Sequence, residues 1–241
     1  MEKVVFKTKD NVEIHGFYVV AEDKRAPAVL LLHMMPAVKE SWREFQGKLR
    51  EAGFQSLAID LRGHGESRWR ARTDADLTQK NAEQNLDYHN FSDEEQQKKI
   101  YDVEAAINFL VERGIAVKNI ALAGASIGAN LALQYQAEHK EIKATVLLSA
   151  GLNYRGVETE PPAKRILPEQ SAFLSGAKED MRSSGASCAD AAQTLFDLLP
   201  SKNKKIAVFE GKEHGTDLFI SHSGLMDNVI KWLKEVYSIE L

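Results

Sequence analysis

The strongest constraint on the fold is an alternation of short apolar runs with apolar residues at helical spacing. It begins with the run "APAVLLLH" (26–33) and continues to the end of the chain. This run and "NIALAG" (119–124) are typical of strands buried on both faces of a parallel sheet. Between such runs, apolar residues recur every three or four positions, as over 103–111, which predicts helices with one buried face. Alternating strands and helices favour right-handed crossovers with helices on both faces of the sheet. The sequence therefore predicts an α/β fold with a twisted, mainly parallel sheet of about eight strands.

Two expected strands precede this alternation, at 4–6 and 12–20, and a short polar turn would pair them in antiparallel fashion at one edge of the sheet. We find no internal repeat and no linker, so we expect one domain over residues 1–241. Two stretches, near 67–97 and 152–170, lack a clear period and are expected to be loop insertions too short for a core of their own. Each leaves the carboxyl end of an expected strand, where ligands bind in open α/β sheets, so we expect them to shape a site. Ordinary surface connections are the alternative interpretation for most of their residues.

Composition excludes several classes of function. The 241 residues include 31 Lys and Arg against 35 Asp and Glu, and a net charge of −4 gives no electrostatic reason to expect nucleic acid or an anionic membrane as a partner. No run approaches the roughly 20 apolar residues of a membrane span, and the N-terminus lacks the apolar core of a signal peptide. The single cysteine, Cys188, cannot form an internal disulfide. We therefore expect a soluble, cytoplasmic protein, and we interpret Cys188 as a small structural residue rather than a catalytic thiol.

The most informative motif is Gly124-Ala-Ser126-Ile-Gly128, at the point where an expected strand gives way to an expected helix. The string alone is weak, because chance would place one in about one chain in twelve of this length. Its context is what the motif requires to expose a serine hydroxyl at the end of a strand. Glycines without a Cβ let neighbouring elements approach closely, and the helix N-terminus supplies free N–H groups. Ser126 is therefore the candidate nucleophile, and a glycine-rich packing turn is the alternative.

A serine nucleophile needs a base, and the base needs a carboxylate. Of the seven histidines, His214 stands in a loop just beyond the last expected strand, at the same edge of the sheet as Ser126. Asp180 follows the expected strand "SAFLSG" (171–176), whereas the other aspartates between Ser126 and His214 fall inside a helix. Its neighbour Glu179 is a rival, but a tight loop would aim only one of the two inward. The sequence predicts a triad of Ser126, Asp180 and His214, with Glu179 as the alternative carboxylate.

This chain order of nucleophile, acid and base on alternating strands and helices resembles the α/β-hydrolase superfamily. The stretch "IDLRGHGES" (59–67) is similar to that superfamily's turn after the strand that precedes the nucleophile strand, and "LLLHMMPAVKESW" (30–42) is similar to its oxyanion loop. The resemblance covers nearly the whole chain and is nearest to small bacterial-type carboxylesterases of the dienelactone-hydrolase-like kind, with little or no cap. No metal or organic cofactor is expected, because no His/Cys/Asp cluster has zinc spacing and no loop has a phosphate-cradling pattern.

The resemblance also implies an oxyanion hole formed by the backbone N–H groups of Ile127 and Met35, with Met34 as the alternative to Met35. Many relatives have His-Gly where this chain has His33-Met34, and a glycine would let the loop turn freely. The Met34 and Met35 side chains are expected to bind substrate by lining an apolar acyl or alcohol pocket. Three polar residues of these two loops are expected to be structural: His33, Arg62 and His64.

The expected function is that of a serine carboxylesterase-type hydrolase. Ser126 would attack the carbonyl of a small or medium ester, and water would then hydrolyse the acyl-enzyme. A thioesterase, an amidase or a peptidase would use the same triad and differ only in pocket shape. A non-catalytic ligand-binding protein on this fold is the alternative from a different class. The expected partner is a small-molecule ester.

Overall fold

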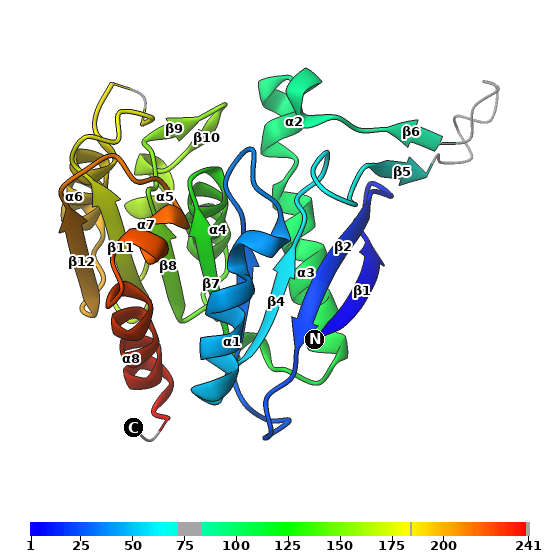
Figure 1. Ribbon diagram of the computed structural model, residues 1–241, viewed down its shortest axis with the longest axis horizontal. Coiled ribbons are helices and arrows are strands. Elements are labelled where there is room, and N and C mark those ends of the chain that lie inside the picture. The colour runs from blue at the N-terminus through cyan, green and yellow to red at the C-terminus, as the bar shows by residue number, and fades with distance from the viewer. Residues whose placement is uncertain (72–82, 184, 240–241) are drawn as a thin grey trace.

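An eight-stranded sheet forms the centre of the computed structural model, which describes residues 1–71, 83–183 and 185–239 (Figure 1). Its strand order is β1-β2-β4-β3-β7-β8-β11-β12. β1 pairs with β2 and β2 with β4 in antiparallel fashion, and every other pair is parallel. The strands are β1 (Glu2–Lys7), β2 (Glu13–Val19), β3 (Ala28–Leu32), β4 (Gln55–Ile59), β7 (Ile120–Ala125), β8 (Ala144–Leu148), β11 (Ser171–Ala177) and β12 (Lys204–Phe209). The expected α/β class, the number of strands and the antiparallel edge are confirmed.

Helices cover both faces of this sheet (Figure 1). They are α1 (Arg43–Glu51), α3 (Ile100–Glu112), α4 (Ile127–Glu138), α6 (Cys188–Leu198), α7 (Asp217–Ser221) and α8 (Leu225–Tyr237), with short 3₁₀ turns η1 (Lys39–Trp42) and η4 (Val117–Asn119). α1, α7 and α8 lie in front of the sheet in Figure 1, and α3, α4 and α6 lie behind it.

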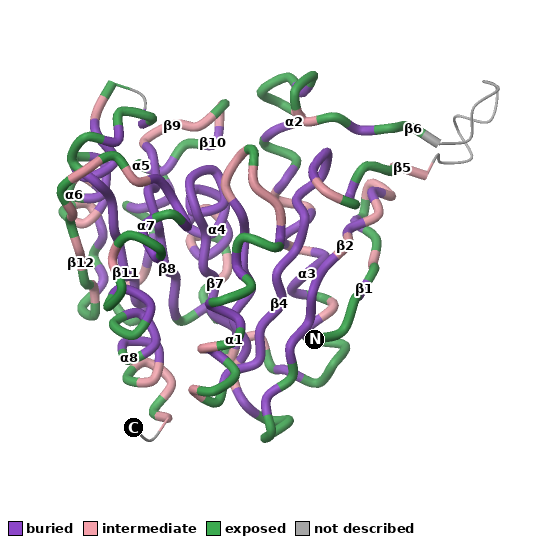
Figure 2. Tube along the Cα trace, in the orientation of Figure 1, coloured by how far each residue is buried: buried purple, intermediate pink, exposed green. Residues whose placement is uncertain are grey.

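Each face of the sheet has its own apolar core, because successive side chains of a strand point to opposite faces. Leu30 and Leu32 of β3 belong to the core under α3 and α4, whereas Val29 and Leu31 belong to the core under α1 and α8. Figure 2 shows the central strands as continuously buried. Burial on both faces accounts for the uninterrupted apolar runs of the sequence.

The two stretches without a clear period contain short elements near the carboxyl edge of the parallel strands (Figure 1). The first holds β5 (Trp69–Ala71), β6 (Glu83–Asn85), η3 (Tyr88–Asn90) and α2 (Asp93–Gln97), and its residues 72–82 lie outside the described part of the chain. The second holds the hairpin β9 (Asn153–Tyr154) and β10 (Val157–Glu158), then α5 (Glu160–Ala163). Within the described residues, no helix has both the length and the apolar character needed to cross a membrane.

Candidate active site

Ser126 occupies a strained turn between β7 and α4. Its φ of 53° and ψ of −122° lie in a region that residues with a side chain rarely adopt. The backbone N–H of Ser126 donates to Leu148 O on β8 at 2.8 Å, and its carbonyl accepts from Ala129 N at 2.9 Å to begin α4. The turn is thus tied to a neighbouring strand on one side and to the helix on the other. Several contacts of this kind keep a strained conformation populated. Strained residues cluster at functional sites.

The two flanking glycines are required because the backbone packs directly on itself around Ser126. A Cβ on Gly124 would lie 2.1 Å from the carbonyl oxygen of Gly128. A Cβ on Gly128 would lie 2.3 Å from the carbonyl oxygen of Leu32, at the end of β3. Both distances are far shorter than van der Waals contact, so neither position tolerates a side chain without backbone movement. The close approach brings the N-terminus of α4 against the loop that begins at His33.

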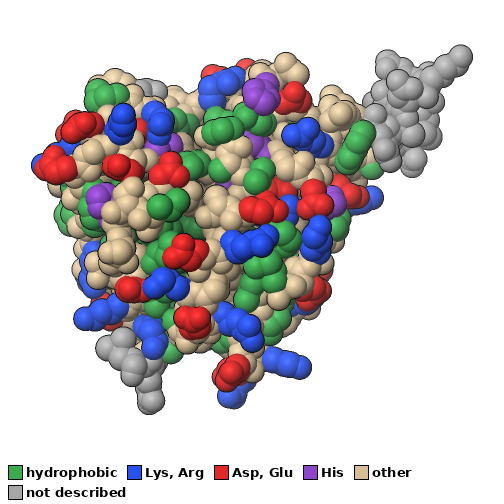
Figure 3. Space-filling model, in the orientation of Figure 1, with side chains coloured by type: hydrophobic (Ala, Val, Ile, Leu, Met, Phe, Trp, Pro, Cys, Tyr) green, Lys and Arg blue, Asp and Glu red, His purple; other side chains and the backbone are tan. Residues whose placement is uncertain are grey.

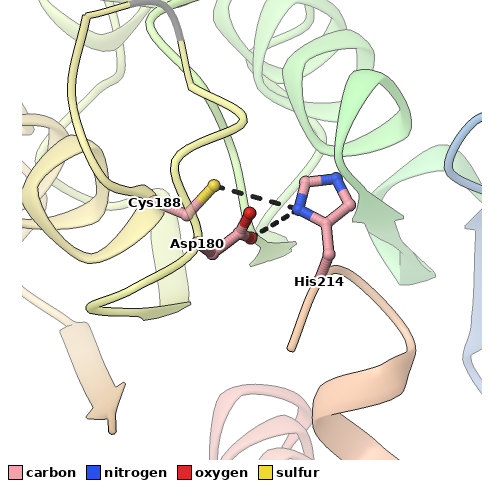
Figure 4. A group of neighbouring side chains, drawn as sticks. All are labelled: Asp180, Cys188 and His214. Carbon is pink, nitrogen blue, oxygen red and sulfur yellow. Dashed lines mark hydrogen bonds and ion pairs between the residues drawn. The ribbon is translucent and has the colours of Figure 1, made fainter. Parts of the chain in front are cut away.

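Asp180 and His214 form a buried pair in the loops after β11 and β12. His214 Nδ1 donates to Asp180 Oδ2 at 2.5 Å, and the two residues are 4% and 2% exposed respectively (Figure 4). Burial alone would raise the pKa of the Asp180 carboxyl, but hydrogen bonds from His214 and from the Cys188 thiol hold it below the usual range. A carboxylate at Nδ1 fixes the tautomer and leaves Nε2 as the acceptor nitrogen.

The rival carboxylate, Glu179, is exposed. Its backbone N–H donates to Gly211 O at 2.8 Å, which extends the pairing between the segments that follow β11 and β12. Asp180 lies at the end of the turn after β11, and its buried carboxylate meets His214. The turn therefore aims only one of the two carboxylates inward.

The loop that carries His214 is fastened to the strand next to Ser126. Gly215 N donates to Ser149 Oγ at 2.9 Å, and Ser149 directly follows β8. The Tyr154 ring meets the His214 imidazole edge-on, with ring centroids 6.3 Å apart. A Cβ on Gly215 would lie 3.1 Å from the Cβ of Ala125, the residue before Ser126, so the His214 loop packs against the serine turn. The three residues of the expected triad thus converge on one region at the carboxyl edge of the sheet.

His33 fixes the loop after β3. Its Nδ1 donates to Met34 O at 2.8 Å, and its Nε2 accepts from Leu61 N at 3.0 Å. Burial lowers the pKa of His33 to about 4, so the ring is neutral in this arrangement. In a planar trans peptide the C=O and N–H point in opposite directions. The carbonyl held by His33 therefore turns the N–H of Met35 away from that ring.

The candidate oxyanion donors are free within the described part of the chain, where neither Ile127 N–H nor Met35 N–H donates to another protein atom. The peptide bond between Met35 and Pro36 is cis. Both methionine side chains are half-buried. Met34 packs toward the loop after His214, with its Sδ 2.6 Å from where a Cβ on Gly215 would lie, and Met35 packs toward Lys99.

Two residues that the sequence did not connect to the site lie beside the triad. Cys188 Sγ is 3.9 Å from His214 Nδ1, on the side that faces Asp180 (Figure 4). Tyr154 OH is 3.4 Å from the same sulfur. A carboxylate oxygen of Asp180, the Cys188 sulfur and a ring nitrogen of His214 lie within 4.8 Å of one another. The hydrogen bond between Asp180 and His214 gives this cluster the geometry of a histidine held by a carboxylate. No signal in the sequence points to Cys188 or Tyr154, because both reach the site only through packing.

The strand order, the strained serine turn and the aspartate–histidine pair define an α/β protein whose site lies at the carboxyl edge of a mainly parallel sheet. Residues 27–187 match the model of a family described as having the alpha/beta hydrolase fold. The chain belongs to this family.

Solved structures with low sequence identity share this fold over nearly the whole chain. An esterase from Pyrococcus furiosus is 18% identical, with a TM-score of 0.72, and the match covers 97% of this chain and 90% of the other. An acetyl xylan esterase from Paenibacillus sp. R4 is 16% identical, with a TM-score of 0.71 and coverage of 95% and 82%. The alpha/beta hydrolase GrgF from Penicillium sp. sh18 is 14% identical, with a TM-score of 0.75 and coverage of 99% of both chains. Compared with curated protein sequences, the chain has no significant match.

Proposed function

We propose that this protein is a serine hydrolase that cleaves carboxylic esters of small to medium size through an acyl-enzyme. One observation carries the proposal: a serine in a strained turn at the end of β7 shares the carboxyl edge of the sheet with a buried, hydrogen-bonded aspartate–histidine pair. A buried pair of this kind is costly unless its partners are satisfied, and here each side chain satisfies the other.

In the proposed reaction, His214 Nε2 takes the proton of the Ser126 hydroxyl as Oγ attacks the ester carbonyl. Asp180 stabilises the imidazolium that forms, because its carboxylate already accepts the Nδ1 proton. The tetrahedral intermediate collapses, the imidazolium protonates the leaving alcohol, and the acyl group remains on Ser126. Water activated by His214 then releases the acid and restores the serine.

The oxyanion of the intermediate is assigned to the free N–H groups of Ile127 and Met35. Ile127 is the first residue of α4, so its N–H also carries the positive end of the helix dipole. The orientation that His33 imposes on the Met34–Met35 peptide supports Met35 over Met34 as the second donor. The Met34 and Met35 side chains would line the pocket for the acyl or alcohol group.

Two features support ester substrates of modest size. Two of the solved structures with this fold are esterases, one from Pyrococcus furiosus and one that acts on acetyl xylan. The segment between β8 and β11 consists of the small hairpin β9–β10 and the single-turn helix α5. We expect so short an insertion to leave room for small esters and water at the site. Figure 3 shows Lys, Arg, Asp and Glu side chains interspersed over the face that carries α1 and α8.

A fluorophosphonate probe tests the nucleophile. We expect the wild type to be labelled once per chain, and Ser126→Ala to remain unlabelled. Equal labelling of both proteins, or none of the wild type, would refute the serine-hydrolase proposal and leave a non-catalytic binding protein as the interpretation. Hydrolysis of p-nitrophenyl esters across acyl lengths tests the substrate class, with a short-chain optimum expected. Faster turnover of matched thioesters or anilides would reassign the protein to a thioesterase or an amidase.

A further inference from the structure

Tyr154 reaches the triad from the hairpin β9–β10. Its hydroxyl donates to Ser149 O at 3.2 Å and lies 3.4 Å from Cys188 Sγ. Its ring stands almost perpendicular to the His214 imidazole, at 89°. The phenol thus contacts the segment after β8, the first residue of α6 and the catalytic histidine at once.

The position of the Tyr154 ring is built into the surrounding structure. Asn130 of α4 donates to Val157 O at 2.7 Å and accepts from Gly151 N at 3.1 Å, which fastens the hairpin to the helix that begins beside Ser126. Thr159 Oγ1 donates to Gly151 O at 2.8 Å. A Cβ on Gly151 would lie 2.6 Å from the Tyr154 ring, so the glycine leaves just enough space for it.

The position of Cys188 is also fixed by its neighbours. Ser187 caps α6 by accepting a hydrogen bond from Asp190 N at 3.0 Å, and Cys188 N donates to Asp180 O at 2.8 Å. A Cβ on Gly176 of β11 would lie 2.4 Å from Cys188 O, so the start of the helix packs directly on the strand. These contacts aim the Cys188 thiol at the Asp180–His214 pair.

Both groups remain protonated and can donate hydrogen bonds. Burial raises the pKa of the Cys188 thiol to about 12, and burial likewise raises the pKa of the Tyr154 phenol well above its usual value. A thiol in this state is unreactive, which argues against a nucleophilic or redox role. The Cys188 sulfur instead lies within 4.8 Å of an Asp180 carboxylate oxygen and 3.9 Å from His214 Nδ1, where its proton can face the carboxylate.

We propose that Cys188 and Tyr154 are positioning residues of the triad: the thiol faces and supports the Asp180 carboxylate, the phenol, whose proton is donated to Ser149 O, packs against the sulfur and the His214 ring, and together they keep His214 aimed at Ser126. This inference rests on the proposed serine-hydrolase function. It adds a second set of contacts to the acid and the base, supplied by α6 and by the hairpin.

Cys188 and Tyr154 should also influence the charge of His214, the proposed catalytic base. Among the described residues, the other charged group paired with Asp180 is Arg182, whose Nη1 lies 3.9 Å from Oδ1 on a largely exposed side chain. Loss of the thiol donor would concentrate negative charge on the Asp180 oxygens. The imidazolium of His214 would then be stabilised more strongly, and the acid limb of the kcat/KM profile would move to higher pH.

Cys188→Ala and Cys188→Ser test the thiol. We expect Cys188→Ala to shift the acid limb upward by about half a pH unit or more and to lower kcat about tenfold, the effect of one lost hydrogen bond. Cys188→Ser keeps a donor at the same place and should restore the limb to its wild-type position. If Cys188→Ala keeps the acid limb of the kcat/KM profile at its wild-type pH, the proposal is overturned. A fall in kcat that parallels a fall in thermal stability, with no shift of the acid limb, would also overturn it.

Tyr154→Phe tests the phenol, with Tyr135→Phe as the matched control. Tyr135 is a buried tyrosine in the later part of α4, where it stacks on His139 at 3.9 Å. We expect Tyr154→Phe to slow fluorophosphonate labelling of Ser126 about tenfold and to lower kcat while KM changes less than about twofold, and Tyr135→Phe to do neither. Equal labelling rates in both variants would refute the role of Tyr154. Failure of the proposed function itself would look different, because the wild type would then not be labelled.

Discussion

Lys99 is a buried lysine beside the candidate oxyanion loop, and it should make the stability of the protein depend on pH. Its Nζ donates to Gln96 Oε1 at 2.5 Å and lies 3.6 Å from Met35 Sδ, in a side chain with no exposed surface. Burial lowers the pKa of the amine from 10.5 to about 7, although Asp102 acts in the opposite direction. The folded protein therefore releases this proton at a pH where the unfolded chain still holds it.

The sign and size of the pH dependence follow from the difference between the pKa of Lys99 in the folded protein and in the unfolded chain. The penalty for burying the charged amine is complete below about pH 7 and fades as the pH rises toward the ordinary pKa of lysine. Each pH unit of difference is worth about 1.4 kcal/mol, and the amine is half-titrated near pH 7. Between about pH 7 and pH 9, Lys99 should therefore raise the free energy of unfolding by about 2 kcal/mol.

Urea unfolding of the wild type and of Lys99→Met measures this contribution. Methionine keeps an unbranched apolar stem and removes the titrating group. Other groups that titrate in this range in the folded or the unfolded chain are common to both proteins and cancel in the difference. We expect the stability of the wild type relative to Lys99→Met to rise by about 2 kcal/mol over the interval. Lys98→Met is the control, because Lys98 is exposed, and it should leave the pH dependence as in the wild type. A pH-independent difference between the wild type and Lys99→Met would refute the reasoning.

Two further pairs of variants test the acid and the serine turn. Asp180→Asn should lower kcat on the order of 10⁴-fold, because an amide no longer holds the His214 tautomer, whereas Glu179→Gln should change kcat less than about twofold; similar losses in both variants would contradict the assignment. Gly128→Ala should lower the free energy of unfolding by about 3 kcal/mol, since its Cβ would lie 2.3 Å from a backbone oxygen. Gly47→Ala, in an open position of α1, should raise it by about 0.5–1 kcal/mol without affecting kcat, and thermal unfolding distinguishes the two.

The sheet was predictable because its strands are buried on both faces. A strand that contacts helices on either side has no polar alternation, so β3, β4, β7, β8 and β11 stand out as apolar runs bounded by turns. The chain order of parallel strands then places every loop that follows a strand at one edge. The candidate triad of Ser126, Asp180 and His214 was predicted by this logic, since it depends on topology and not on side-chain packing.

The residues that the sequence did not connect to the site come together only through close packing. Cys188 follows Asp180 in the chain, but its place beside His214 depends on where α6 begins and on the missing Cβ of Gly176. Tyr154 depends in the same way on a hairpin whose strands have two residues each, too short to leave a periodic pattern. Sequence periodicity reports which face of an element is buried, and it carries no information on which side chains from separate loops will meet.

Polar contacts hold the loop after β3, where Met34 stands at the position at which the family resemblance suggests a glycine. Met34 has an ordinary negative φ, so the loop does not use the conformation that favours glycine. Instead, His33 fixes the Met34 carbonyl, and Asp60 accepts from both the backbone N–H and the Nζ of Lys39, at 2.9 and 2.6 Å. The Lys39 and Asp60 side chains are almost fully buried, and such pairs contribute little net stability but select one conformation over its rivals. The loop is therefore fixed from both ends by His33 and by the Lys39–Asp60 pair, on either side of the N–H group proposed as the second oxyanion donor.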